Sequence, residues 1–160
     1  MNEISAVVSD FSRVLLFPTD NSYEGSLNEL NNRLMKNDAD YTFLDYFSLN
    51  KELLAFYREL NKELPVFIFT SDSIQDHPAI KEELAQIFRG VFSAKELNVL
   101  KDEAWSYAKL AELLHIKTDE ILYIDDQQKN IDAATGAGCK TLLFVDTASL
   151  IQNLKQLLTK

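Results

Sequence analysis

The chain has 160 residues, a hydrophobic content of 46% and a formal net charge of −9 that comes from 25 acidic and 16 basic side chains. This length suits one domain with a sizeable core, and the composition excludes the fibrous and disordered classes. The acidic balance disfavours a nucleic-acid partner and binding to an anionic membrane, because both require a basic surface.

The first half of the chain begins with a short apolar strand and continues with helices. The opening run is partly β-branched and ends at Asp10, which is typical of a buried strand. Leucines at helical spacing then predict two one-faced helices. In chain order, the expected elements are a strand over 4–9, an extended piece over 14–17, a helix over 26–36, an aromatic-rich segment over 37–48 without a clear period, and a helix over 49–64.

The second half alternates apolar strands with helices. The run over 66–69 is uninterrupted, as a strand buried on both faces requires. Pro78 is expected in the first turn of a helix, where its missing N–H costs nothing. In the next helix, over 103–115, the residues expected to face inward are Ala104, Tyr107, Ala108, Ala111 and Leu114. The expected elements are a strand over 66–69, a helix from Pro78 to Phe88, a short strand over 91–92, a helix over 103–115, a strand over 121–124, a helix over 128–137, a strand over 141–145 and a closing helix marked by Leu150 and Leu158.

Apolar strands that alternate with one-faced helices predict an α/β fold, in which helices cover both sides of a mainly parallel sheet. No internal repeat, low-complexity tract or linker interrupts the sequence, so we expect a single domain over residues 1–160. Cys139 is the only cysteine, which excludes an intrachain disulfide and fits a reducing compartment. The start from Met1 to Ser5 lacks a signal-peptide pattern, and no apolar run approaches the roughly 20 residues of a membrane span. We therefore expect a cytoplasmic protein.

Polar residues follow three of the predicted strands. Asp10 ends the first, Thr70 and Ser71 end the strand at 66–69, and Asp125 and Asp126 end the strand at 121–124. Each residue type alone also suits a helix cap or a loop. Ligands of open parallel sheets bind at the carboxyl ends of the strands, so three such ends in neighbouring strands indicate a site.

Converging carboxylates repel one another and need compensation. A hard divalent cation such as Mg²⁺ supplies it through oxygen ligands, and it binds substrate phosphate as well. A carboxylate beside such a metal is also able to attack phosphorus and form an acyl phosphate. Lys101, which precedes the helix over 103–115, is the candidate cation that offsets the charge of this intermediate.

Four stretches resemble, in order, the motifs of the haloacid dehalogenase-like (HAD) hydrolase superfamily. Val8 to Leu15 is similar to a strand followed by D-x-D-x-[TV], and Phe67 to Ser71 resembles the strand that ends in Thr or Ser. Lys101 resembles the lysine of the third motif, and Tyr123 to Asn130 resembles the fourth motif, I-D-D-x-x-x-N. The resemblance implies a Rossmann-like, five-stranded sandwich of the phosphatase-like branch, with residues from about 19 to 48 as a rudimentary helical cap.

The resemblance also implies roles for single residues. Asp10 is the expected nucleophile, Thr70 the hydroxyl that binds the transferring phosphoryl group, and Lys101 the partner of both nucleophile and phosphate. Substrate binding is expected to include the backbone N–H of Ser71 and the guanidinium of Arg13, although a solvated loop arginine is an equal alternative. The implied Mg²⁺ ligands are Asp10, the backbone carbonyl of Ser12, Asp125 and Asp126.

Ser12 departs from the family pattern. Family phosphatases have there an Asp that protonates the leaving group and then activates water, which contributes about 10²–10⁴-fold. A serine hydroxyl is a poor acid and base, so its presence predicts slow turnover unless another group acts. Glu24 and Asp20, in the expected cap, are substitutes that the sequence alone does not position.

Three functions remain open. The first is a Mg²⁺-dependent phosphatase that acts on a small phosphorylated metabolite through an aspartyl-phosphate on Asp10. The second, motivated by Ser12, is a weak or inactive HAD-like domain that binds a phosphorylated ligand or a protein partner. The third is carbon–halogen hydrolysis, which the pair Asp125 and Asp126 disfavours because that reaction needs no metal.

Overall fold

The computed structural model describes residues 3–159, so the predictions for Met1, Asn2 and Lys160 lie outside the described residues. Its centre is a sheet in the order β5-β4-β1-β6-β7, and all four neighbouring pairs run parallel. This confirms the predicted five-stranded α/β sheet. The strands are β1 (Ala6–Ser9), β4 (Val66–Thr70), β5 (Gly90–Ser93), β6 (Ile121–Asp125) and β7 (Lys140–Leu143).

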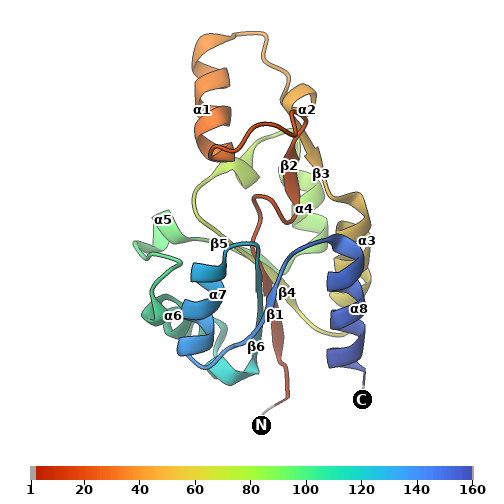
Figure 1. The fold of residues 1–160 in the computed structure, drawn as a ribbon, viewed down its shortest axis with the longest axis vertical. Coiled ribbons are helices and arrows are strands. Elements are labelled where there is room, and N and C mark those ends of the chain that lie inside the picture. Colours follow the sequence, from red (N-terminus) through yellow and green to blue (C-terminus); the bar gives the residue numbers. More distant parts are fainter. Residues whose placement is uncertain (1–2, 160) are drawn as a thin grey trace.

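Helices cover both faces of the sheet, which gives the expected three layers (Figure 1). On one face lie α3 (Lys51–Leu60), α4 (Lys81–Ile87) and α8 (Thr147–Leu158). On the other face lie α5 (Ala94–Leu97), α6 (Ala104–Leu114) and α7 (Gln128–Gly136). Two short 3₁₀ turns, η1 (Ile74–Asp76) and η2 (Thr118–Glu120), complete the connections. Among residues 3–159, no helix is long and apolar enough to cross a membrane.

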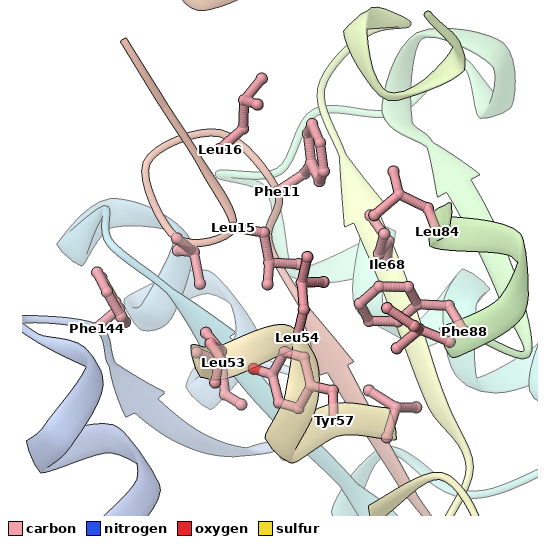
Figure 2. Close-up of a cluster of buried hydrophobic side chains, with 14 of the residues drawn as sticks. Phe11, Leu15, Leu16, Leu53, Leu54, Tyr57, Ile68, Leu84, Phe88 and Phe144 are labelled. Atoms are coloured by element: carbon pink, nitrogen blue, oxygen red, sulfur yellow. The ribbon is translucent and has the colours of Figure 1, made fainter. Parts of the chain in front are cut away.

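Two hydrophobic clusters hold these layers together. Successive residues of a strand point to opposite faces, so Val7 belongs to the cluster of α3, α4 and α8 while Val8 belongs to that of α6 and α7. Figure 2 shows the first cluster, in which Leu53, Leu54 and Tyr57 of α3 lie beside residues of β4 and of the segment after β1. This packing fixes the chain on both sides of Asp10.

A tight turn follows β1 and leads into a second, small sheet. The backbone N–H groups of Leu15 and Leu16 both donate to the carbonyl of Phe11, and Arg13 has a left-handed φ of 62°. β2 (Leu16–Pro18) then pairs antiparallel with β3 (Phe47–Leu49). Between them lie α1 (Leu27–Asn37) and α2 (Phe43–Tyr46), beyond the carboxyl ends of the main sheet (Figure 1).

The structure corrects two local predictions. Helix α4 begins at Lys81, because the carbonyl of His77 accepts from the N–H of Ile80 and of Lys81 in a separate turn, and Pro78 therefore precedes the helix. The inward face of α6 is rotated: Ala104 and Ala108 are exposed, whereas Ser106 is buried. The hydroxyl of Ser106 donates to the carbonyl of Leu100, which satisfies this polar group inside the fold.

Candidate active site

The carboxyl ends of three adjacent strands carry the predicted residues. β1 lies between β4 and β6, with Ser9 in register with both Ile68 and Ile124. Asp10, which follows β1, is therefore next to Thr70 at the end of β4 and Asp125 at the end of β6. The structure brings these side chains to one edge of the sheet, as a parallel arrangement requires.

Lys101 lies between two of these carboxylates. Its Nζ is 2.6 Å from Oδ1 of Asp10 and 2.9 Å from Oδ2 of Asp125, and all three side chains are at least nine-tenths buried. The ammonium also lies 5.5 Å from the ring centre of Phe69 and 5.9 Å from that of Tyr123. Cation–π attraction adds to the ion pairs here, so the position of this lysine is tightly determined.

Several donors orient Asp125. The backbone N–H of Gln127 donates to Oδ1 at 2.8 Å, and Nδ2 of Asn130 donates to Oδ2 at 3.1 Å. The hydroxyl of Tyr123 donates to Oδ2 as well. Tyr123 is not among the predicted site residues, although its position two residues before Asp125 puts both side chains on the same face of β6.

Asp10, Asp125 and Asp126 form an acidic cluster in which one carboxylate oxygen from each residue lies within 4.8 Å of the other two. Oxygen ligands at this spacing suit a hard cation, and Mg²⁺ is bound in proteins by one or two carboxylates together with water and phosphate. The donor set therefore fits the divalent metal that the sequence analysis predicted.

Without a metal, burial dominates the electrostatics of the cluster. Burial raises the pKa of Asp10 to about 8, against the opposing effect of Lys101 and with a further increase from Asp125. Burial also raises the pKa of Asp126, and Asp125 adds to the shift. For Asp125 itself burial acts in the same direction, but Lys101 and the donors from Tyr123 and Gln127 outweigh it and lower the pKa. A divalent cation would favour the ionised form of all three.

Two buried hydroxyls at the site have no hydrogen-bond partner among residues 3–159, namely those of Ser12 and Thr70. Buried polar atoms are almost always paired, so unpaired ones mark positions where a ligand or water completes the bonding. Ser9 is paired instead: it accepts from the hydroxyl of Tyr57 at 3.1 Å and donates to the carbonyl of Asp10 at 2.9 Å.

A cavity of about 700 Å³ opens onto this edge of the sheet. Of the predicted site residues, those that line it are Asp10, Ser12, Arg13, Ser71, Lys101 and Asp126. Thr70 and Asp125 are fully buried and lie outside the lining. Glu24 lines the cavity too, whereas Asp20 does not and binds the N–H and hydroxyl of Ser22. The guanidinium of Arg13 donates to the backbone carbonyls of Tyr23 and Gly25.

A sequence model of the haloacid dehalogenase-like hydrolases matches residues 16–138, more than half of the chain. The chain belongs to this hydrolase family. The match begins after Asp10, so the family assignment is independent of the strand that carries this carboxylate. It confirms the resemblance to the family, and the second, third and fourth motifs lie within the matched residues.

Known relatives and solved structures agree with this assignment. Enolase-phosphatase E1 from Caenorhabditis elegans is 32% identical over 91 residues, which are 53% of this chain but only 36% of that protein. A predicted HAD-like hydrolase from Porphyromonas gingivalis has a TM-score of 0.70 at 16% identity, covering 99% of this chain and 100% of its own. A HAD-family enzyme from Bacteroides thetaiotaomicron, in complex with magnesium and inorganic phosphate, has a TM-score of 0.68 at 13% identity, covering 92% and 98%.

Proposed function

We propose that this HAD-like hydrolase is a Mg²⁺-dependent phosphatase for a small phosphorylated metabolite. The observation that carries the proposal is Lys101, held 2.6 Å from Asp10 and 2.9 Å from Asp125 beside the acidic cluster. The similarity to an enolase-phosphatase over half of the chain supports the same reaction class.

In the proposed reaction, a carboxylate oxygen of Asp10 attacks phosphorus, and the bond from phosphorus to the leaving oxygen breaks. The unpaired hydroxyl of Thr70 and the backbone N–H of Ser71 bind the phosphoryl oxygens, and Lys101 offsets their charge. Water then attacks phosphorus and releases phosphate from Asp10. Mg²⁺, bound by the acidic cluster and the backbone carbonyl of Ser12, would neutralise charge on the phosphoryl group.

A second candidate function is ligand binding without efficient turnover. Ser12 favours it, since a hydroxyl in place of a carboxyl leaves the usual acid and base position without a group that ionises near neutral pH. The two functions differ in one measurable respect: a binding domain retains affinity for a phosphorylated ligand but releases no phosphate from it.

The test is a screen of phosphorylated metabolites for phosphate release, with Mg²⁺ and with a chelator, on the wild type and on Asp10→Asn. We expect release that needs Mg²⁺ and that falls to background in the variant, whose amide is not a nucleophile. Asp132→Asn, on the exposed side of α7, is the matched control and should keep full activity. Undiminished release by Asp10→Asn would contradict the mechanism, and chelator-resistant cleavage of a haloacid would instead favour dehalogenation.

A further inference from the structure

The segment that carries Glu24 is attached to the residue after Ser12. One guanidinium nitrogen of Arg13, Nη2, lies 3.0 Å from the carbonyl of Tyr23 and 2.8 Å from that of Gly25, the two neighbours of Glu24. Arg13 itself is held in a left-handed conformation by the turn after β1, in which its N–H donates to the carbonyl of Leu16 at 2.7 Å. The position of Glu24 is thus tied to that of Ser12.

The same segment is closely packed internally. A Cβ at Gly25 would lie 2.5 Å from the hydroxyl oxygen of Tyr23, so only glycine allows the tyrosine ring to pass over this position. The Tyr23 hydroxyl donates to the carbonyl of Ser26 at 3.0 Å, and Ser26 in turn caps helix α1 through its bond from the N–H of Glu29. These contacts restrict the backbone on both sides of Glu24.

Among the described residues, Glu24 is also the cavity carboxylate that has no ion pair and lies outside the acidic cluster. The cavity wall includes Asp10, Asp126, Asp102 and Glu24. The first two belong to the acidic cluster, and Asp102 lies 4.0 Å from Nζ of Lys129. Within residues 3–159, Glu24 forms no ion pair, so its carboxyl group is available to a ligand in the cavity.

We propose that Glu24 is the general acid and base that replaces the missing carboxyl at Ser12. The inference rests on the proposed phosphatase function. As Asp10 attacks phosphorus, the carboxylic acid of Glu24 gives its proton to the leaving oxygen, so that the alcohol departs and a carboxylate remains. This carboxylate then takes a proton from the water that attacks phosphorus, which restores both the acid and the free Asp10.

The leaving group provides the decisive test. For Glu24→Gln we expect kcat/KM to fall about 10²–10⁴-fold with phenyl phosphate, because phenolate is a poor leaving group without a proton. With p-nitrophenyl phosphate, kcat/KM should change little, since p-nitrophenolate leaves unprotonated, while kcat falls because water is no longer activated. Glu29→Gln, which removes the same charge from the exposed first turn of α1, should behave as the wild type.

A rescue experiment separates catalysis from a structural role of Glu24. Ser12→Asp should restore activity on phenyl phosphate in the Glu24→Gln background and add little to the wild type. Equal losses of kcat/KM on both substrates, no loss at all, or a large gain from Ser12→Asp in the wild type would each overturn the assignment of Glu24. If the wild type releases no phosphate from either probe, the proposed function fails, and this inference fails with it.

Discussion

Lys101 is the residue on which the electrostatics of the site depend. Its ammonium group contacts the carboxylates of Asp10 and Asp125. Its backbone carbonyl accepts a hydrogen bond from the hydroxyl of Tyr107. Burial acts to lower the pKa of Lys101, but the two carboxylates outweigh burial and raise it. The lysine therefore stays charged and is the internal counterion of the metal-free site.

Replacing this counterion should destabilise the protein in a metal-dependent way. We expect Lys101→Met to lower the free energy of unfolding by about 3–5 kcal/mol in a chelator, because the buried carboxylate of Asp125 loses its cationic partner and Asp10 loses its hydrogen bond from Nζ. Addition of Mg²⁺ should recover part of the loss. Urea unfolding measures both values, and Lys95→Met is the control, since its exposed pair with Asp72 at 3.4 Å is worth at most about 1 kcal/mol. Equal losses in the two variants would contradict this account.

Asp10 should impose a pH dependence on the metal-free protein. Its pKa is raised from 3.8 to about 8, so the stability it contributes is present below pH 3.8 and is lost as the pH rises toward 8. As the pH rises from 3.8 to about 8, the free energy of unfolding of the wild type should therefore fall relative to that of Asp10→Asn.

Asp146 is the control for that measurement, because its pKa is shifted in the opposite direction from that of Asp10. Hydrogen bonds from the backbone N–H and the hydroxyl of Ser149 lower its pKa, so the stability it contributes is present above pH 3.8 and is lost as the pH falls. Asp146→Asn should accordingly lose most relative to the wild type near neutral pH. A pH profile for Asp10→Asn that parallels that of Asp146→Asn would show that folding lowers the pKa of the Asp10 carboxyl, which would contradict the raised value.

At the residue scale, the acidic side chains and Lys101 could be predicted to meet because parallel strands end at one edge and the motifs set their order. Their chemical roles stay predictions. The Tyr57–Ser9–Asp10 chain of hydrogen bonds could not be predicted, since it joins residues 48 positions apart through a helix-to-strand contact. The same applies to Arg13, whose carbonyl partners follow from the turn after β1.

Among the secondary-structure elements, Asn50 joins three that are distant in sequence. Its Oδ1 caps helix α3 by accepting from the N–H of Leu53, and its Nδ2 donates to the carbonyl of Val14 at 3.0 Å and to the hydroxyl of Thr147 at 2.8 Å. The turn after β1, the start of α3 and the start of α8 are therefore connected through one amide.

Loss of this amide should cost more than loss of an ordinary surface asparagine. For Asn50→Ala we expect a decrease of about 1–3 kcal/mol in the free energy of unfolding, from the lost cap and the unpaired carbonyl of Val14. Asn32→Ala, on the exposed surface of α1, should be neutral or slightly stabilising, because alanine favours a helix. Thermal or urea unfolding distinguishes the two, and a neutral Asn50→Ala would contradict the proposed link.

Elements with an apolar run or helical spacing could be predicted, and very short ones without either could not. The five strands of the main sheet and the helices α1, α3, α4, α6, α7 and α8 could be predicted to exist, although α4 begins later than expected and the buried face of α6 differs. β3 and α5 have three and four residues, and they form because β2 offers a pairing edge and Ser93 caps the next turn. The extent of the segment from 19 to 48 as a cap stays a prediction.

Over the whole molecule, the net charge of −9 would repel an anionic substrate. The wall of the cavity is less acidic than the molecule as a whole, since it includes Arg13, Lys95, Lys101 and Lys129 beside four acidic residues. A divalent cation at the acidic cluster would make this wall positive overall. This protein, although acidic overall, would then attract a phosphorylated substrate to the cavity.

Trapping of the phosphoryl group on the protein shows whether Asp10 is the nucleophile. The wild type with Mg²⁺ is mixed with p-nitrophenyl phosphate, quenched in acid within one turnover, and digested for mass spectrometry. The account predicts a phosphoryl group on Asp10, and none when Asp10→Asn is treated in the same way. Phosphate release without any phosphorylated carboxylate, or with the label on another residue, would contradict it.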